Sequence, residues 1–254
     1  MAGLPVTGIC FFETTGSTND DALAWLSEGA EDGCLVIADE QTSGRGRMQR
    51  KWITRKGCAL AFSLIFRPEM ISSLSLYAPL GALGVSMAFE NLFDLRPEIK
   101  WPNDILLERK KVCGILTEAS WQGDILTGVV LGIGINIASS SVRHDDEFLF
   151  PAVSLEETLG RPVERLDLLE EILKMIFDWQ AKLETQEFIE EWNRRLAFRG
   201  ENVIIHQPGK EPMTATILQI AQDGLLWVRR ENGTEISVSA GDISKNANYL
   251  KPER

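Results

Sequence analysis

The stretch Gln41-Thr-Ser-Gly-Arg-Gly-Arg-Met-Gln-Arg-Lys-Trp52 begins a strongly basic segment in an acidic chain. No Asp or Glu occurs between Gln41 and Pro68, and six cations gather early in this span: Arg45, Arg47, Arg50, Lys51, Arg55 and Lys56. The 254 residues carry a formal charge of -11, so the chain outside these six cations sums to -17 (-11 minus 6). Gly44 and Gly46 let the backbone approach a ligand closely, and arginine presents a planar fork that matches phosphate or carboxylate. The segment is therefore either a loop that closes on a polyphosphate ligand or a solvated basic loop that offsets the negative charge of the surface.

The segments on either side of this basic stretch are apolar and predict two buried strands, Cys34–Ala38 and Cys58–Phe66. The connection between them runs to roughly 20 residues, longer than most loops in compact domains, and such loops are often functional. A loop with rigid roots and a free tip is the usual arrangement for ligand binding.

The composition predicts a soluble globular protein, with 44% hydrophobic and 25% charged residues. The acidic balance argues against a general nucleic-acid or anionic-membrane binder, and no apolar run reaches the length of a membrane span. The first residues lack the pattern of a secretory signal. The four cysteines form no CxxC pair, which argues against a zinc site and favours reduced thiols in the cytoplasm.

The first part of the chain predicts a strand at Ile9–Phe12 and then a helix that starts near Ser17-Thr18-Asn19. These three polar residues either cap the helix or hydrogen-bond a small polar ligand, and capping is the simpler interpretation. A long helix is expected over Ser72–Leu95, with Pro79 at a kink or in the true first turn.

The segment Ile99–Leu107 predicts a strand that bends at Pro102, because proline cannot sit in a central ladder. The polar residues Lys100, Asn103 and Asp104 at this bend either face a pocket or form a plain turn.

A hairpin is expected next, with strands at Val112–Ala119 and Ile125–Ile137. Glycines inside strands often mark a close approach to the backbone, so Gly114, Gly128, Gly132 and Gly134 predict a flat floor on which a ligand lies. The run Gly132-Ile-Gly-Ile-Asn136 is not a dinucleotide fingerprint, since the third glycine and the following helix are absent.

Helical periodicity returns at Leu166–Leu183 and Phe188–Leu196. After Gly200 the pattern changes from helical periodicity to short apolar runs. Short strands separated by Pro-Gly, Asp-Gly and Asn-Gly turns predict a small β-barrel. We therefore expect a catalytic domain over residues 1–199 and a small β-barrel domain over residues 200–254. The two histidines, His144 and His206, lack metal-ligand spacing and are expected on the surface.

Several motifs appear in one order along the chain: Ser17-Thr18-Asn19, the Gly44-Arg-Gly-Arg47 loop with Arg50-Lys-Trp52, Lys100-Trp-Pro-Asn-Asp104, Lys111 with Gly114-Ile-Leu116, and Gly132-Ile-Gly-Ile-Asn136. Together they resemble the biotin–protein ligases, also called biotin–[acetyl-CoA-carboxylase] ligases. The resemblance implies an α/β (α+β) fold with a central mixed β-sheet flanked by helices, followed by a small SH3-like β-barrel.

The resemblance also implies a two-step ligase reaction. Biotin and ATP with Mg²⁺ give biotinyl-5′-AMP and pyrophosphate, and one lysine of a biotin carboxyl carrier domain then attacks the mixed anhydride. It implies catalytic roles for Arg45, Arg47, Lys111 and Asp104, where Asp104 steers or deprotonates the incoming lysine. The implied biotin-binding residues are Ser17, Thr18, Asn19, Gln41, Gly44, Arg45, Lys111, Gly114 and Gly132. The implied ATP-binding residues are Arg45, Arg47, Arg50, Trp52, Asn103, Asp104 and Asn136. The Mg²⁺ is expected to come with ATP rather than in a protein-held site.

The chain departs from the family pattern in two places. Gln49 stands where the family's loop often has glycine, which puts affinity for the adenylate in doubt. No winged helix precedes the motifs, so we expect neither sequence-specific DNA binding nor repression. A homodimer is possible. The alternatives are a lipoate or octanoate ligase or transferase of the same fold, and a non-enzymatic nucleic-acid binder, which the charge of -11 disfavours.

Overall fold

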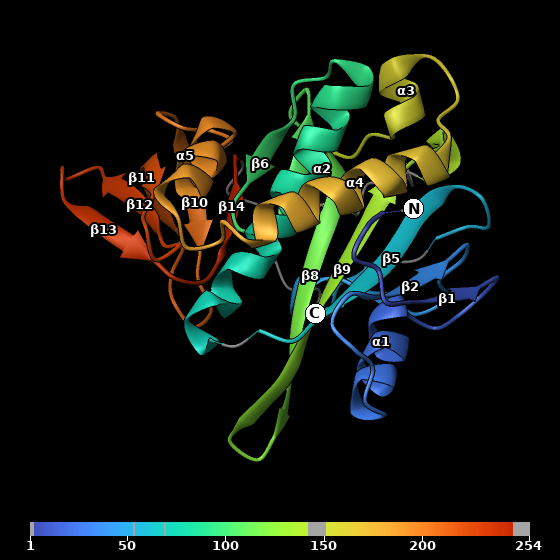
Figure 1. Ribbon diagram of the computed structural model, residues 1–254. Helices are drawn as coiled ribbons and strands as arrows, with labels where there is room; N and C mark the ends of the chain where they lie inside the picture. The colour runs from blue at the N-terminus through green and yellow to red at the C-terminus, as the bar shows by residue number, and fades with distance from the viewer. Residues whose placement is uncertain (1–2, 53, 69, 142–150, 246–254) are drawn as a thin grey trace.

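The computed structural model describes residues 3–52, 54–68, 70–141 and 151–245, and it contains two main sheets (Figure 1). The larger sheet has the strand order β1-β2-β5-β9-β8-β7-β6. Its strands are β1 (Gly8–Phe12), β2 (Cys34–Ala38), β5 (Ala59–Phe66), β6 (Glu98–Lys100), β7 (Asp104–Leu107), β8 (Lys110–Gln122) and β9 (Ile125–Asn136). Only β1 and β2 pair in parallel, and the other neighbours are antiparallel, so the expected mixed sheet is confirmed.

Helices cover both faces of this sheet (Figure 1). The long helices α2 (Tyr77–Phe93) and α4 (Arg165–Gln180) pack on one face, and α1 (Thr18–Ser27) packs on the other. The shorter helices are α3 (Leu155–Leu159) and α5 (Gln186–Arg194), with 3-10 turns at Arg47–Gln49, Ile71–Leu76 and Ser139–Ser141. Among the described residues, no helix is both long and apolar enough to cross a membrane.

The strand β5 shows how the sequence divides between the two faces. Phe62, Leu64 and Phe66 point into the large core under α2 and α4, whereas Ile65 joins a smaller core beneath α1. All eight residues of β5 are buried, as its continuous apolar run predicts. Ser63 is the one polar residue of β5, and its hydroxyl is buried on the face that α1 covers.

Two predicted elements differ in the structure. The expected helix over Ser72–Leu95 is a 3-10 turn followed by α2, and Pro79 lies in the first turn of α2, where its missing N–H costs nothing. The expected strand at Ile99–Leu107 is a hairpin instead: β6 pairs with β7 in antiparallel register, and the cis Trp101-Pro102 bond lies in the turn between them.

The C-terminal part forms a five-stranded antiparallel sheet in the order β13-β12-β11-β10-β14. Its strands are β10 (Asn202–His206), β11 (Met213–Ile220), β12 (Leu226–Arg230), β13 (Glu235–Val238) and β14 (Asp242–Ser244). Gly209, Gly224 and Gly233 adopt positive φ in the three predicted turns. The surface placement of His206 is wrong: the side chain is 3% exposed, and its Nε2 lies 2.8 Å from Ser244 Oγ. His144 lies outside the described residues.

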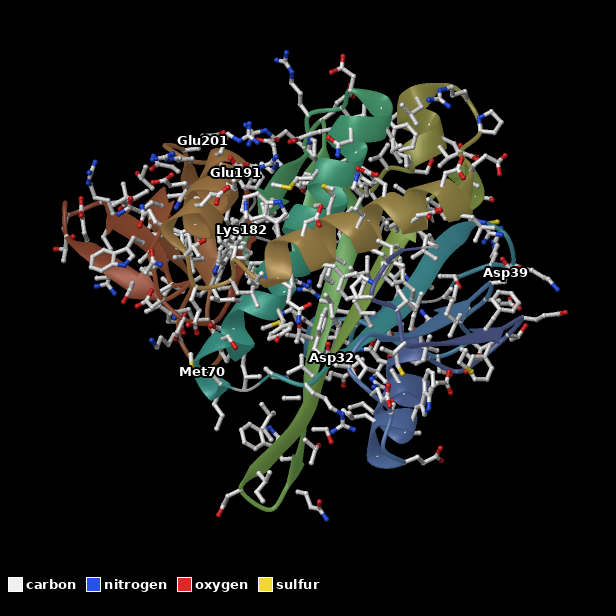
Figure 2. All side chains as sticks on the ribbon, viewed as in Figure 1. Asp32, Asp39, Met70, Lys182, Glu191 and Glu201 are labelled. Carbon is white, nitrogen blue, oxygen red and sulfur yellow. The ribbon has the colours of Figure 1, made fainter. Side chains whose placement is uncertain are left out.

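The two sheets share one continuous apolar core. The chain passes from one to the other beside β6, where Ile99 N donates to Arg195 O (2.7 Å) and Ala197 N donates to Ile99 O (2.9 Å). Buried Arg195 also donates to Glu90 and to Glu191 on α5, which lies beside the C-terminal sheet (Figure 2). A domain boundary at Gly200 remains a proposal, since buried side chains on both sides of it belong to this core.

Candidate active site

The basic loop (residues 41–56) folds as a small ribbon over the α1 face of the large sheet. Within it, β3 (Gly44–Arg45) pairs with β4 (Lys51–Trp52). Its base is closed by two hydrogen bonds between Gln41 and Thr54. Next to this base, the Asp39 carboxylate accepts from Gly57 N (3.1 Å) and from Arg165 (2.7 Å) (Figure 2). The predicted loop with fixed roots is therefore present.

The sheet beneath the loop lacks side chains at two neighbouring positions of β9. A Cβ at Gly134 would lie 2.6 Å from Trp52 Cε2, and one at Gly132 would lie 2.0 Å from Asn19 Oδ1. The groups that approach these two glycines closely are side chains of the protein itself, and the floor for a ligand stays a prediction. Trp52 covers one position from the loop, and Asn19 covers the other from α1.

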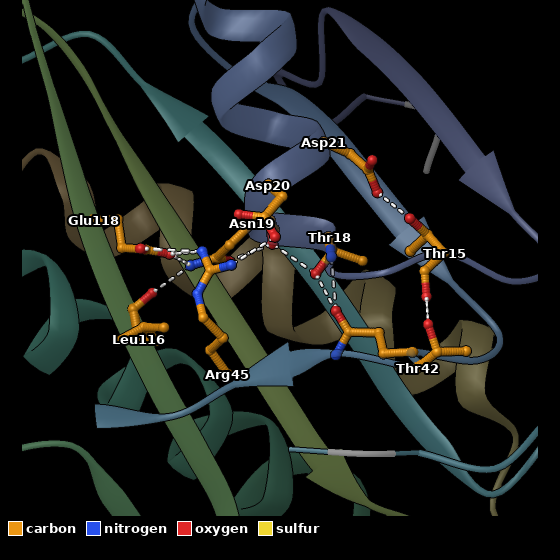
Figure 3. Close-up of polar contacts among 11 residues, drawn as sticks. Thr15, Thr18, Asn19, Asp20, Asp21, Thr42, Arg45, Leu116 and Glu118 are labelled. Atoms are coloured by element: carbon orange, nitrogen blue, oxygen red, sulfur yellow. Dashed lines mark hydrogen bonds and ion pairs between the residues drawn. The ribbon is translucent and has the colours of Figure 1, made fainter. Parts of the chain in front are cut away.

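The polar residues at the start of α1 are buried and face the loop (Figure 3). Gln41 Oε1 accepts from Thr18 N (2.7 Å) and Thr18 Oγ1 (3.0 Å). Ser17 occupies the N-cap position without a side-chain capping hydrogen bond, so the capping interpretation is wrong for this residue. A buried hydroxyl at a helix start with no capping role leaves its hydrogen-bonding capacity for another partner.

Asn19 is fixed by partners on three strands of the sheet. Ser63 Oγ on β5 lies 2.6 Å from Asn19 Oδ1 and 2.8 Å from Thr18 Oγ1. Asn19 Nδ2 donates to Glu118 Oε2 (2.7 Å) and to Leu116 O (3.3 Å) on β8, while its carbonyl side covers Gly132 of β9. The network holds the amide in one orientation.

Arg45 folds inward and pairs with two carboxylates (Figure 3). Its Nη1 lies 2.5 Å from Asp20 Oδ2, and its Nη2 lies 3.2 Å and 3.3 Å from the oxygens of Glu118. The hydrogen bond to Asp20, together with the charges of Glu118 and Asp20, outweighs burial and raises the pKa of Arg45. The guanidinium is therefore fully charged at the edge of the site.

The next two arginines of the loop reach the opposite side of the site. Arg47 donates to Asn103 Oδ1 (3.3 Å) and to Gly241 O (3.1 Å). Arg50 donates to Asp242 Oδ2 (2.9 Å). The basic loop thus contacts the β6–β7 turn and the start of β14, so the C-terminal sheet contributes to the site.

A buried ion network lies beneath these contacts. Asp104 Oδ1 is 2.6 Å from Lys111 Nζ, and Asp104 Oδ2 is 3.3 Å from Lys100 Nζ. Lys100 Nζ also donates to Asp242 Oδ1 (2.6 Å). Burial opposes ionisation of Asp104, but the charges of Lys111 and Lys100 outweigh it and lower the pKa of Asp104. The carboxylate is ionised at neutral pH.

The remaining expected residues are placed differently. Gly114 leaves room for Lys111, whose Nζ would lie 3.1 Å from a Cβ there, and Gly44 leaves room for the Trp52 carbonyl. Asn136 is buried and donates to Val153 O (3.2 Å), and it has no direct hydrogen bond to the other predicted ATP residues in the described part of the chain. The Trp52 Nε1–H is buried without a hydrogen-bond partner among the described residues.

Three site residues were not predicted: Ser63, Glu118 and Asp242. Glu118 could have been noticed as the acid that follows the apolar run Val112–Leu116 and Thr117, and Ser63 as a hydroxyl within an otherwise apolar strand. Asp242 lies in β14 at the edge of the C-terminal sheet. It is 192 positions after Arg50, and no local sequence signal connects it to the basic loop. Its carboxylate is buried, and the charges of Lys100 and Arg50 hold its pKa well below the usual range.

The charges of the site nearly cancel. Five cations stand against four carboxylates: Arg45, Arg47, Arg50, Lys100 and Lys111 against Asp20, Asp104, Glu118 and Asp242. The arrangement can bind anions where a ligand's carboxylate or phosphate contacts arginines that the internal carboxylates already hold in place.

Comparison with known proteins places this geometry in a family. Residues 11–136 match the model of the Biotin/lipoate A/B protein ligase family. The chain is 32% identical over 240 residues to the biotin–[acetyl-CoA-carboxylase] ligase of Paracoccus denitrificans, covering 89% of this chain and 96% of that protein. It is 30% identical to the ligase of the same name from Mycobacterium tuberculosis, covering 90% of this chain and 85% of that one.

The bifunctional ligase/repressor BirA of Bacillus subtilis is 36% identical over 166 residues, and that match spans about half (51%) of the Bacillus protein. Among solved structures, the biotin protein ligase from Aquifex aeolicus in complex with biotin and ATP superposes with a TM-score of 0.80 at 29% identity. The superposition covers 94% of this chain and 98% of that one. The chain therefore belongs to the Biotin/lipoate A/B protein ligase family, among its biotin protein ligases.

Proposed function

We propose that this protein is a biotin–protein ligase that activates biotin with ATP to biotinyl-5′-AMP. The observation that supports it best is the placement of cations on both sides of sheet positions that lack side chains, with Arg45 on the α1 side and Arg47, Arg50 and Lys111 on the other. Joining a carboxylate to an α-phosphate brings like charges together, so fixed cations around both groups are required. The relatives named above carry the same activity in their names.

Biotin is assigned to the side of the site nearest α1. Its ureido ring presents N–H and C=O groups, which suit the buried polar groups of Ser17, Thr18 and Gln41. Asn19 and Arg45 border the same region over Gly132, and Gly44 keeps the loop backbone close to it. Because Asn19 lies over Gly132, a ligand on this side would contact the Asn19 amide rather than the strand backbone at Gly132.

ATP is assigned to the side nearest the β6–β7 turn. Arg47 and Arg50 contact the consecutive residues Gly241 and Asp242 there, and the Asn103 amide donates to Ile115 O while accepting from Arg47. Trp52 offers a flat aromatic face, and its unpartnered Nε1–H is free to donate to a ligand. Asn136 belongs to this side through its position at the end of β9.

Lys111 is paired with Asp104 and lies next to Gly114, the β8 glycine that pairs with Gly134 of β9. We assign it to the biotin carboxylate and the α-phosphate together, since an ammonium between two anions lowers the cost of bringing them together. Asp104 has a lowered pKa, so it is a weak base. We therefore assign it to orienting the neutral ε-amine that attacks the mixed anhydride rather than to removing the proton from the lysine ammonium.

The remaining parts of the proposal concern metal, partner and location. No group of three His, Cys, Asp or Glu side chains in the described ranges is arranged to hold a metal ion, so we assign the Mg²⁺ to the phosphates of ATP, as is usual for this cation. The second substrate is a biotin carboxyl carrier domain, in keeping with the name of the Paracoccus relative. The four free cysteines suit the reducing cytoplasm.

The decisive experiment is biotin-dependent exchange of labelled pyrophosphate into ATP. We expect exchange with biotin and none with lipoate or octanoate, because the relatives are biotin ligases. Equal exchange with lipoate, or no exchange with biotin, would contradict the proposal. Transfer is then measured as biotin incorporated into a purified carrier domain.

A further inference from the structure

Glu118 connects the two elements that border the proposed biotin side. It is carried by β8 in register with Val130 of β9, so its backbone is held by the sheet. One carboxylate oxygen accepts from Asn19 Nδ2 at 2.7 Å, and both oxygens lie within 3.3 Å of Arg45 Nη2. A single carboxylate thus contacts helix α1 and the basic loop (Figure 3).

We infer that Glu118 is a positioning residue that sets the placement of Asn19 and Arg45 for biotin. The inference rests on the proposed function. Glu118 acts through these two side chains rather than on the reacting atoms.

The Asn19 amide shows what the carboxylate fixes. Its oxygen lies 2.6 Å from Ser63 Oγ, and its NH₂ group donates to Glu118 and to Leu116 O. Turning the amide over would place its oxygen against the negative carboxylate, which can only accept hydrogen bonds. Glu118 therefore selects the orientation in which the Asn19 amide oxygen, rather than its NH₂ group, lies closest to Gly132.

The Arg45 guanidinium is held between two carboxylates of different character. The Asp20 side chain is 51% exposed on the surface of α1, whereas the Glu118 side chain is 29% exposed and stands on a sheet strand. Glu118 therefore fixes the position of the Arg45 guanidinium more firmly than Asp20 does, because exposed ion pairs are weak and screened by salt. Preorganised charges near a reacting centre give more stabilisation than charges that must move into place.

Within the part of the chain that the structure describes, the Glu118 side chain forms hydrogen bonds and ion pairs only with residues of the biotin side. Arg47 contacts Asn103 and Gly241, Arg50 contacts Asp242, and Lys111 contacts Asp104. A change at Glu118 is therefore expected to alter biotin binding without an equal change in ATP binding. A general loss of folding would affect both ligands.

The test is the substitution Glu118→Gln, with binding of biotin and of ATP with Mg²⁺ measured separately by calorimetry. Gln keeps the size but loses the charge, and its NH₂ group, which can only donate, replaces one of the two oxygens that face Arg45. We expect the Kd for biotin to rise about tenfold or more, since hydrogen bonds to charged groups are the stronger ones. The Kd for ATP is expected to change by less than about twofold, because ATP-side contacts are intact.

Three further variants make the result specific. Glu13→Gln removes another acid that pairs with the basic loop, through Lys56 at 3.1 Å, and is expected to leave both Kd values unchanged. Glu118→Asp keeps the charge and should recover part of the biotin affinity. In an Arg45→Ala background, Glu118→Gln should cost less than it does alone, since part of its effect passes through Arg45.

The inference is overturned if Glu118→Gln leaves biotin binding unchanged, tightens it, or weakens both ligands equally with a lowered melting temperature. Tighter binding would show that Glu118 competes with the biotin carboxylate for Arg45. These outcomes are distinct from a failure of the proposed function, in which the unaltered protein itself would show no biotin-dependent exchange.

Discussion

The Lys100 ammonium lies 2.6 Å from an Asp242 carboxylate oxygen, although 142 positions separate the two residues. Both side chains are almost completely buried, and the second oxygen of Asp242 accepts from Arg50 of the basic loop. The start of β14 therefore holds the loop against the β6–β7 hairpin, so the C-terminal sheet supports the candidate site directly.

The substitution Asp242→Asn should destabilise the protein by about 3 kcal/mol, because it leaves a buried ammonium with less compensation. Urea unfolding followed by fluorescence measures this loss. Glu235→Gln is the control, since it breaks the exposed Arg229–Glu235 pair in the same sheet (2.9 Å) and should cost less than about 1 kcal/mol. Equal losses in the two variants would mean that the buried network contributes nothing specific.

Lys111→Ala should reduce adenylate formation by roughly 100-fold or more with little effect on folding, because it removes a fixed charge from the reacting groups. Lys111 is partly exposed, and Lys100 still compensates Asp104 in the variant. The matched control is Lys110→Ala, which removes the exposed neighbouring cation at the start of β8. Pyrophosphate exchange near the unaltered rate in Lys111→Ala would contradict the assigned role.

Gly134→Ala should displace Trp52 from the sheet, because the new Cβ would lie 2.6 Å from the indole ring. We expect a loss of roughly 1–3 kcal/mol, as for other overpacked sites, and faster tryptic cleavage of the basic loop. At Gly16 a Cβ would meet nothing within 4 Å, so Gly16→Ala is the control for adding a methyl group near the site. Identical cleavage rates for both variants would show that Trp52 does not anchor the loop.

The pH dependence of stability should include a contribution from His206. Burial lowers its pKa, so the unfolded chain binds the proton more readily than the folded protein does. The corresponding stability is complete above the unfolded pKa of about 6.5 and is lost as the pH falls below it. In urea unfolding at pH 7.5 and pH 5.5, His206→Gln should show a smaller loss than the unaltered protein. A loss of the same size would assign the pH dependence to other groups.

The sequence predicted most elements of the fold because burial leaves a local pattern. The apolar runs at Cys34–Ala38 and Cys58–Phe66 became adjacent strands, β2 and β5, and the turn glycines placed the C-terminal strands correctly. The sequence did not show that the predicted helix divides into a 3-10 turn and α2, because 3-10 and α-helical turns have similar spacings of apolar residues.

The candidate site was less accessible from the sequence because its contacts are distant. Glu118 meets Arg45 across 73 positions and Asn19 across 99. Motif order located the basic loop and the Lys100–Asp104 turn, but it could not show that the chain's own acids neutralise the arginines. It also could not show that Asn19 and Trp52 fill the space above the glycines.

The close matching of cations by internal carboxylates affects how substrates arrive. A site with one excess positive charge, on a chain of charge -11, exerts little long-range pull on a nucleotide or a vitamin carboxylate. Encounter should therefore proceed at the rate of ordinary diffusion, with weak dependence on ionic strength. Discrimination then falls to the residence time, which depends on the contacts made inside the site rather than on long-range attraction.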